Sequence, residues 1–289
     1  MNDNGPFKVV HEYGETRLTS QPSRIVTIST GQTDAAVSLG VVPVGTTRGH
    51  GTGIYEPYLS LNYVNLARRL GSMMDLGERK DPDINLVNSI KPDIILLNAA
   101  GLQKHETYIQ LNEIAPTVVT KGKGTNWRED FITLALALGR CREADSWLRH
   151  YDQDCRKHSG EGTKVAFIRA NGSRIKIMGH NSFAGMIAKD LGFLTQGAMA
   201  GDSVSCELYA GDLNNLDAEW VFYGGQSGGA ETIRATPEWK SVPAVRAGKA
   251  IEVPFQPFFN NAGPTAARIV QNLLCAVIEG RESKSNSGY

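Results

Sequence analysis

The chain has 289 residues, 41% of them hydrophobic, and its 30 basic residues balance 30 acidic ones. This length allows one large domain or two of ordinary size with a well-buried core. Zero formal net charge argues against a general nucleic-acid or membrane-surface binder, and no apolar run reaches the ~18 residues that span a bilayer.

The first half of the chain alternates strand and helix patterns. In chain order, these are a β-branched strand at 24–30, a helix at 31–40, a strand and loop at 41–51, a helix at 81–90, a strand at 91–98, a helix at 105–115 and a strand at 116–121. Such alternation predicts parallel strands that are joined by helices.

The second half repeats this plan. Its patterns are strands at 163–170 and 173–179, a helix at 181–192, a helix followed by a strand at 212–224, a turn, short helix and strand at 236–254, and a terminal helix at 263–280. The repetition predicts two similar α/β units, each with its own small sheet.

A long helical stripe separates the two halves. Over residues 126–157 the larger apolar side chains recur at steps of mostly three and four, which predicts a helix of about eight turns that could kink at Gly139. One rigid helix at 126–158 would then join lobes at 1–125 and 159–289. A ligand is expected between the lobes, at the carboxyl ends of their strands.

The four cysteines, Cys141, Cys155, Cys206 and Cys275, form no CxxC pair, so a zinc ribbon or thioredoxin site is not expected. Cys141 and Cys155 fall on the predicted long helix, roughly 21 Å apart, which is too far for a disulfide. Buried free thiols are favoured. The first ten residues lack the pattern of a signal peptide, so the chain is expected to be cytosolic or a mature form without its leader.

Taken in order, several stretches resemble the substrate-binding proteins of ABC importers for ferric siderophores, cobalamin or haem. They are PSRIVTIST with DAAVSLGVVPVGTT, DLGERKDPDINLVNSIKPDIILLN, LNEIAPTVV, FIRANGSRIKIMGHNSFAGMIAKDLGF and EWKSVPAVRAGKAIEVP. The resemblance covers nearly the whole chain, and the ferric-siderophore branch is the most similar. It implies an α/β fold of two Rossmann-like lobes with mainly parallel sheets, bridged by a single long α-helix, the class III type of periplasmic binding protein.

The resemblance also implies a function. The chain would be a monomeric, periplasmic or lipid-anchored cell-surface protein that captures a ferric siderophore and delivers it to an ABC permease, without enzymatic activity. The siderophore already fills the six coordination positions of iron, so neither a protein metal ligand nor a cofactor is expected. A hydroxamate or mixed-type siderophore is favoured, because a tris-catecholate would need a denser basic cleft.

A bulky anionic ligand calls for guanidinium groups and aromatic walls. Arg169, at the carboxyl end of an apolar strand, matches a position where the family often has a ligand-binding arginine, whereas Arg68 and Arg69 are expected to be solvated. The full set of candidate ligand-binding residues is Gln32, Arg48, Asn98, Trp127, Arg169, Arg174, Tyr223, Phe255, Phe258 and Phe259.

Members of the family usually carry an exposed glutamate on each lobe, which pairs with permease arginines. The first of these positions is Asn85 here, with Glu78, Asp81 and Asp83 nearby. In the second half either Glu207 or Asp212 matches. Docking to a standard permease is therefore an open question, and a carrier that serves no permease is an alternative.

Other functions are less well supported. Residues 225–229 fit the G-x-S-x-G pattern of hydrolases, but the last histidine, His180, precedes that serine, so the hydrolase order is impossible. Neither common nucleotide-binding glycine motif occurs, and the six histidines are too scattered for a zinc site. Haem or cobalamin binding by the same fold stays open.

Overall fold

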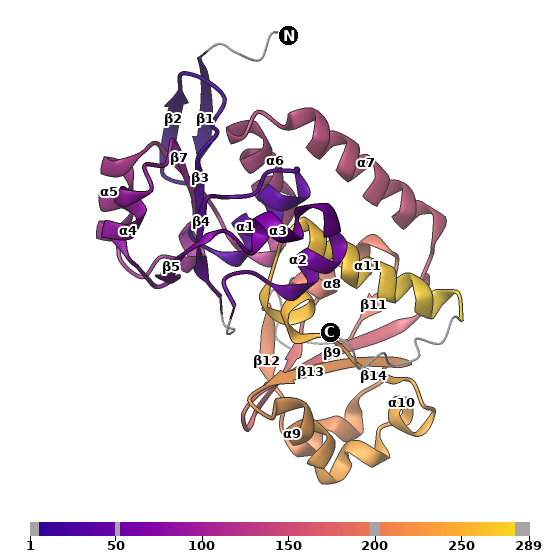
Figure 1. Ribbon diagram of the computed structural model, residues 1–289. Coiled ribbons are helices and arrows are strands. Elements are labelled where there is room, and N and C mark those ends of the chain that lie inside the picture. Colours follow the sequence, from indigo (N-terminus) through magenta and orange to yellow (C-terminus); the bar gives the residue numbers. More distant parts are fainter. Residues whose placement is uncertain (1–5, 50–52, 197–202, 281–289) are drawn as a thin grey trace. The chain divides into compact units, whose positions relative to one another are not determined.

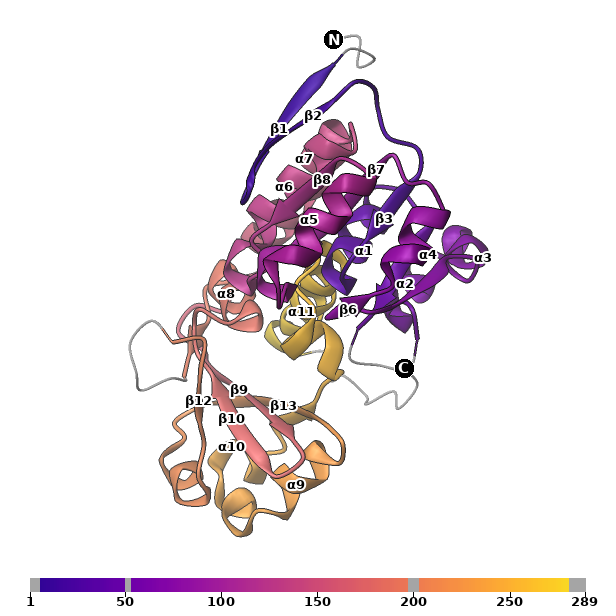
Figure 2. The same ribbon diagram turned by 90° about the vertical axis from the view of Figure 1, so that its left-hand side faces the viewer.

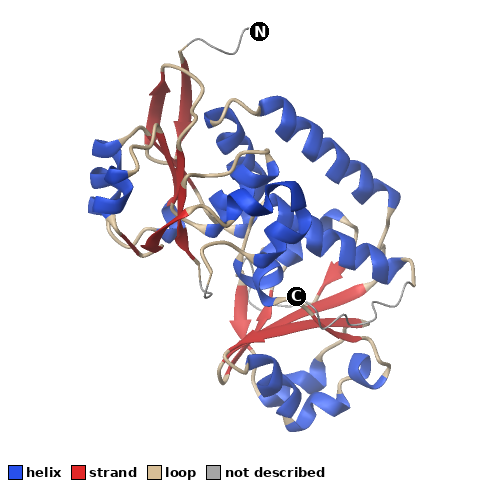
Figure 3. Ribbon diagram, in the orientation of Figure 1, coloured by secondary structure: helices blue, strands red, loops and turns tan. Residues whose placement is uncertain are grey.

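The computed structural model describes residues 6–49, 53–196 and 203–280. The chain forms two compact units, unit 1 (Met1–Arg149 with Ala262–Thr265) and unit 2 (His150–Asn261 with Ala266–Tyr289). Each unit contains a six-stranded sheet with helices on both of its faces (Figure 3). The predicted α/β class with mainly parallel sheets is confirmed.

The sheet of unit 1 has the strand order β6-β5-β4-β3-β7-β8. Its strands are β3 (Ile25–Thr27), β4 (Gly45–Arg48), β5 (Met74–Glu78), β6 (Asp81–Pro82), β7 (Ile94–Asn98) and β8 (Thr117–Thr120). All neighbouring pairs are parallel except β5 with β6. The carboxyl ends of five strands therefore lie at the same edge of the sheet.

Two helical layers bury the sheet of unit 1, and for this reason strand β7, which lies between β3 and β8, is apolar without alternation. Ile94 and Leu96 pack with α1 and α6 on one face, whereas Ile95 and Leu97 pack with α4 and α5 on the other (Figure 1). These helices are α1 (Thr30–Ser38), α4 (Ile84–Ser89), α5 (His105–Ile114) and α6 (Trp127–Ala137).

Unit 1 also contains elements that the sequence patterns did not predict. A hairpin of β1 (Phe7–His11) and β2 (Gly14–Leu18) lies beside β8 and α6 (Figure 2). Its strands bury only Val9, Thr16 and Leu18, too few for a clear alternation. The remaining elements are α2 (Pro57–Asn62), the 3-10 turn Val64–Leu66, α3 (Ala67–Leu70), and the 3-10 turns Ala99–Gly101 and Gly124–Asn126.

The sheet of unit 2 has the strand order β12-β10-β9-β13-β14, and β11 also pairs with β9. Its strands are β9 (Lys164–Asn171), β10 (Arg174–Met178), β11 (Leu194–Thr195), β12 (Ser205–Glu207), β13 (Trp220–Gln226) and β14 (Ala250–Glu252). Strands β9, β11, β13 and β14 pair in parallel, and β10 is antiparallel to β9 and β12.

Helices cover both faces of this second sheet, with α9 and α10 on one side and α8 and α11 on the other (Figure 1). Alternate residues of β13 divide between the faces, so Val221 and Tyr223 join the cluster under α9, whereas Phe222 packs on Phe258 opposite. The helices and 3-10 turns are α8 (Phe183–Asp190), Ala210–Asn215, α9 (Gly229–Ala235), Pro237–Ser241, α10 (Pro243–Arg246) and α11 (Pro264–Ile278).

The long helix predicted over 126–157 is divided in two, α6 and α7 (Cys141–Lys157). Gly139 adopts a positive φ of 63°, and its N–H bonds the Leu136 carbonyl, while the Arg140 N–H reaches back 2.7 Å to the Ala135 carbonyl. These two bonds form a Schellman motif, which ends a helix at a glycine that tolerates this conformation. Helix α6 therefore ends at the position where the sequence predicted only a kink.

None of the four cysteines is joined in a disulfide, as predicted, and Cys141 and Cys155 do lie on one helix, α7. The predicted burial holds only for Cys275, because Cys141 is exposed and the other two are half-buried. Within residues 6–49, 53–196 and 203–280, no helix is both long and apolar enough to cross a membrane.

Candidate functional site

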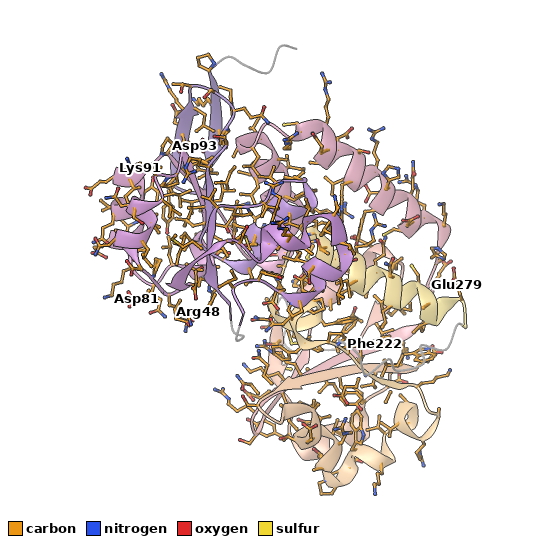
Figure 4. All side chains as sticks on the ribbon, viewed as in Figure 1. Arg48, Asp81, Lys91, Asp93, Phe222 and Glu279 are labelled. Atoms are coloured by element: carbon orange, nitrogen blue, oxygen red, sulfur yellow. The ribbon has the colours of Figure 1, made fainter. Side chains whose placement is uncertain are left out.

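The carboxyl ends of the parallel strands in unit 1 carry most of its candidate residues. Arg48 ends β4 and Asn98 ends β7, and Gln32 lies in the first turn of α1, directly after β3. Arg48 and Asp81 lie at this edge, whereas Asp93, directly before β7, lies at the opposite one (Figure 4). The backbones of Gln32, Arg48 and Asn98 therefore lie at the ends of strands, as predicted.

Arg48 is already neutralised by carboxylates of the neighbouring strand. Its Nε lies 3.3 Å from Asp75 Oδ2 and 3.6 Å from Glu78 Oε1. The side chain is 39% exposed. A ligand anion would therefore have to compete with two carboxylates for this guanidinium.

Asn98 and Gln32 are buried hydrogen-bonding residues and do not form an open surface. The Asn98 Nδ2 donates to Ser29 Oγ at 2.9 Å and to Gln32 Oε1 at 3.1 Å. Asn98 Oδ1 accepts from the Gly101 N–H at 2.6 Å, and Gln32 Nε2 donates to Thr120 Oγ1 at 2.8 Å. These groups already bind the protein itself, so a ligand would have to share or exchange these bonds, and the role of Asn98 and Gln32 as ligand hydrogen bonders stays a prediction.

Arg79 is the residue that sequence reasoning missed at this edge. It follows β5, is half-buried, and burial lowers the pKa of its guanidinium. Among the residues that the structure describes, its guanidinium makes no ion pair or hydrogen bond. A charged group in such a place is costly unless a ligand or solvent meets it. The signal was present, since an arginine directly followed a strand, but no strand was predicted at residues 74–78.

Trp127 is 1% exposed and packs edge-on against Trp147 at 6.0 Å, with the Arg128 guanidinium 4.9 Å from its ring centre. Of the two orientations open from the sequence, the structure therefore supports the packed one. Trp127 is removed from the candidate ligand surface.

Arg169 is the central candidate of unit 2. It lies on β9, opposite Lys176 of β10 on one side and Gly224 of β13 on the other. Its Nη1 donates to the Phe259 carbonyl at 3.3 Å. Burial lowers the pKa of this guanidinium, although the nearby Glu207 charge opposes the shift. A half-buried arginine with one neutral acceptor keeps most of its donors for another partner.

Arg174 differs from Arg169 in being an exposed, paired residue. Its Nη2 lies 2.9 Å from Glu207 Oε1, which also lies 3.4 Å from Lys176 Nζ. The side chain of Arg174 is 73% exposed. The pKa of Glu207 is lowered by its hydrogen bond to Arg174.

Three predicted aromatic residues lie in a π-helical turn, Gln256–Asn260, and its preceding residue, where the sequence indicated only a loop. Phe258 is 1% exposed and lies over Phe222, which stacks on Phe167 at 5.4 Å. Phe259 is also buried, and only Phe255 is half-buried, with its ring 5.6 Å from that of Phe259. Phe258 is thus a core residue, and Phe255 is the accessible member.

Tyr223 belongs to the core of unit 2 as well. It is 7% exposed, and its ring meets Trp239 edge-on at 4.9 Å. Its hydroxyl is hydrogen-bonded to Arg234, which raises the pKa of that arginine. Side chains alternate along β13, and Tyr223 lies on the face that α9 covers, so its contact with a ligand stays a prediction that the burial of the ring does not favour.

The predicted docking carboxylates all have partners within the protein. Glu78 faces Arg48, and Glu207 faces Arg174 and Lys176. Asp83 caps α4 by accepting the Leu86 N–H at 3.0 Å, and Asp212 accepts the Tyr209 N–H at 2.9 Å. Each carboxylate is exposed or half-buried, so these contacts are compatible with a second partner.

Within the described part of the chain, no group of three or more His, Cys, Asp and Glu side chains is arranged to hold a metal ion. Each unit instead carries candidate guanidiniums near the carboxyl ends of its parallel strands, and unit 2 also carries an aromatic turn. A family model described as a periplasmic binding protein matches residues 25–257. The chain belongs to this family.

Relatives in this family have similar lengths. The chain is 27% identical over 277 residues to the Fe(3+)-citrate-binding protein YfmC of Bacillus subtilis (strain 168), which covers 87% of this chain and 82% of that one. It is 25% identical over 266 residues to the probable siderophore-binding lipoprotein YfiY of the same organism, covering 85% and 79%. Over 203 residues it is 24% identical to the Fe(3+) dicitrate-binding periplasmic protein FecB of Escherichia coli (strain K12), covering 68% and 64%.

A solved structure supports the fold. Staphylococcus aureus SirA complexed with staphyloferrin B superposes with a TM-score of 0.77 at 22% identity, covering 92% of this chain and 97% of that one. The periplasmic binding protein fold is therefore shown. The family consists of substrate-binding proteins, and this member is not an enzyme.

Proposed function

We propose that the chain is an extracytoplasmic binding protein that captures a ferric siderophore and delivers it to an ABC permease for iron uptake. The observation that carries the proposal is a pair of half-buried arginines at strand carboxyl ends, Arg79 in unit 1 and Arg169 in unit 2. Arg79 has no internal partner among the described residues, and Arg169 has a single neutral acceptor. Partly desolvated guanidiniums bind anions strongly and in a defined orientation.

The ligand is proposed to be a hydroxamate or mixed-type ferric siderophore with carboxylate or hydroxamate oxygens at its periphery. Two such arginines fit a ligand of low negative charge, because Arg48 and Arg174 are occupied by carboxylates. Phe255 offers a half-buried aromatic surface for the apolar part of the ligand. The name of one relative, the probable siderophore-binding lipoprotein YfiY, supports a siderophore as the ligand.

Ferric citrate is the second candidate, since two relatives are named as Fe(3+)-citrate-binding proteins. Citrate offers carboxylates to guanidiniums in the same bidentate geometry, but it has no large apolar part. Phe255 would then contribute little to affinity, whereas it would contribute to a siderophore with an aliphatic or aromatic backbone.

Quenching of tryptophan fluorescence tests both candidates in one experiment. The protein is titrated in parallel with ferrioxamine, a ferric carboxylate–hydroxamate siderophore, ferric citrate, ferric enterobactin, haem and cobalamin. Saturable quenching by one of the first two, stronger than by its iron-free form, supports the proposal. Saturation only with ferric citrate supports the second candidate, and saturation only with haem or cobalamin overturns both.

Delivery to a permease is proposed through the exposed carboxylates Glu78 or Asp83 in unit 1 and Glu207 or Asp212 in unit 2. Association with a candidate ABC permease for ferric chelates, measured in detergent or nanodiscs, is the test. Loss of association after substitution of one carboxylate in each unit supports delivery. A protein that binds the chelate but no permease would instead be a carrier.

A further inference from the structure

Two residues from different secondary structure elements hold the loops that lie next to the Arg79 side chain. We propose that Asp130 of α6 and Asn98 of β7 are positioning residues that fix Arg79 for the ligand, through the backbone of Gly122 and Gly101. This inference rests on the proposed role of Arg79 as a ligand contact. It assigns a function to an aspartate that no sequence motif singled out.

The first step of the connection is a carboxylate that holds the chain after β8. Asp130 Oδ1 accepts the Lys121 N–H at 3.0 Å, and its Oδ2 accepts the Gly122 N–H at 2.8 Å. Two charge-assisted bonds to neighbouring backbone groups fix the path of this loop. Gly122 has a positive φ of 76°, so the loop depends on a conformation that few other residues adopt.

The second step passes from Gly122 to Asn98. A Cβ atom on Gly122 would lie 2.5 Å from the Asn98 side chain, so the Gly122 backbone is packed directly against that amide. Asn98 Nδ2 is anchored by Ser29 and Gln32 on its other side. The amide therefore has one position, which the Asp130-bound loop helps to define.

The third step passes from Asn98 to Arg79. Asn98 Oδ1 accepts the Gly101 N–H at 2.6 Å, which fixes the 3-10 turn after β7. A Cβ atom on Gly101 would lie 3.2 Å from Arg79 Nη1 and 3.4 Å from its Cδ. The turn is thus the wall against which the Arg79 side chain lies. Since no described residue bonds its guanidinium, this wall is what defines its orientation.

The charges around Asp130 make the connection sensitive to acid. Burial raises the pKa of Asp130 to about 6, although its two backbone hydrogen bonds oppose the shift. The charged groups facing it are Glu129 of its own helix and Lys121 of the loop, which pair with each other at 2.8 Å, and Glu12 of the hairpin, which acts on Lys121. Protonation below this pKa weakens the acceptor of both backbone bonds and should loosen the loop.

The test is a double-mutant cycle on ligand affinity at pH 7.5, with the chelate that binds best in the titration above and ferric citrate as the common probe. Asp130→Asn should weaken binding about tenfold in the unsubstituted protein, the scale of one charge-assisted hydrogen bond. In an Arg79→Ala background the same substitution should have no effect, because its route to the ligand is gone. In an Arg169→Ala background the tenfold loss should remain, which is the matched control.

A second measurement needs no ligand. Amide hydrogen exchange in residues 99–102 should accelerate in Asp130→Asn, although Asp130 makes no bond to this segment, and should accelerate in wild type when the pH falls from 7.5 to 5.5, after correction for intrinsic exchange. Asp130→Asn should lack this pH response.

The two measurements separate the possible failures. Unchanged exchange at residues 99–102 would overturn the connection, whatever the ligand does. An altered exchange with additive affinity losses in the cycle would overturn the positioning role. If no chelate binds the wild type, the proposed function fails, and the exchange data still decide whether Asp130 and Asn98 control the turn beside Arg79.

Discussion

The two units hold their key arginines in different ways. In unit 1 the loops beside Arg79 are fixed by hydrogen bonds of polar side chains, among them the buried Asn98 and the half-buried Asp130. In unit 2 the turn beside Arg169 is fixed by aromatic packing, because Phe259 accepts from Arg169 while Phe258 is buried on Phe222. The same α/β plan can thus hold the surroundings of a half-buried guanidinium with hydrogen bonds or with apolar contacts. The first is sensitive to pH, and the second is sensitive to side-chain volume.

Truncation of the aromatic packing is expected to have the largest effect. Phe258→Ala should lower the free energy of unfolding by about 3–5 kcal/mol, the usual cost of removing a fully buried phenylalanine. Urea denaturation followed by circular dichroism measures it. Phe255→Ala, which removes a half-buried ring of the same turn, should cost much less. Equal losses of unfolding free energy in the two variants would show that the buried Phe258 does not stabilise the turn more than Phe255 does.

The pH dependence of stability should reside in unit 1. Burial, with the negative charge of Asp34, raises the pKa of Glu56 from 4.5 to about 7. Between these values the folded chain keeps a proton that the unfolded chain has lost, so stability should decrease as the pH rises from 4.5 to 7. The decrease is up to about 3 kcal/mol.

Denaturation curves at several pH values check this expectation. Glu56→Gln keeps the shape of the side chain and should remove the contribution of Glu56, whereas the contribution of Asp130, whose pKa burial raises to about 6, should remain until Asp130→Asn is added. In unit 2 the described carboxyl with a resolved shift is Glu207, whose pKa is lowered by Arg174. Glu207→Gln should therefore leave the decrease in place, and its loss in that variant would contradict the assignment to unit 1.

Substitution of the two half-buried arginines should weaken ligand binding in both units. Arg79→Ala and Arg169→Ala should each cost about 1.5–3 kcal/mol of binding free energy, the range for hydrogen bonds to charged groups. Isothermal titration with the best chelate measures this cost. Arg48→Ala and Arg174→Ala are the matched controls, since carboxylates already occupy both side chains. Larger losses in the controls would move the site to the paired arginines.

The smallest expected effect distinguishes two roles of Asp83, the capping of helix α4 and the proposed docking to a permease. Asp83→Ala should lower stability by about 1 kcal/mol, because the carboxylate caps α4. Asp83→Asn keeps the cap and removes the charge, so it should preserve stability and weaken only association with a permease. Thermal denaturation and a permease-binding assay distinguish the two. A destabilised Asp83→Asn would show that the charge itself stabilises the helix.

Much of the fold followed from sequence patterns. Continuous apolar runs such as 91–98 predicted buried parallel strands, because a strand covered on both faces needs no polar side. The short strand at 74–78 was missed, since only Leu76 in it is fully buried, and with it the position of Arg79. The stop at Gly139 was underestimated, because the apolar spacing of mostly three and four residues continues in the sequence on both sides of this glycine.

The candidate site was harder to predict than the fold. Residue type and strand-end position placed Arg48, Asn98 and Arg169 at the correct edges. They could not tell which of them the protein itself would bind. That choice depends on contacts between distant segments, such as Asn98 with Gly122 and Arg48 with Asp75. The alternation of side chains along β13 would have assigned Tyr223 to the core if the sequence had shown which face of the neighbouring strands is buried.

The four residues Ala262–Thr265 belong to unit 1, although they follow 112 residues of unit 2, His150–Asn261. The Thr265 N–H donates to Asp34 Oδ1 at 2.8 Å, and Gly263 lies so close that a Cβ atom there would be 2.3 Å from the Asp34 carboxyl carbon. During synthesis, the amino-terminal unit therefore cannot complete its structure when its own first 149 residues have left the ribosome. It waits for a short segment that follows 112 residues of unit 2, so unit 1 can complete its structure only after most of unit 2 has been synthesised.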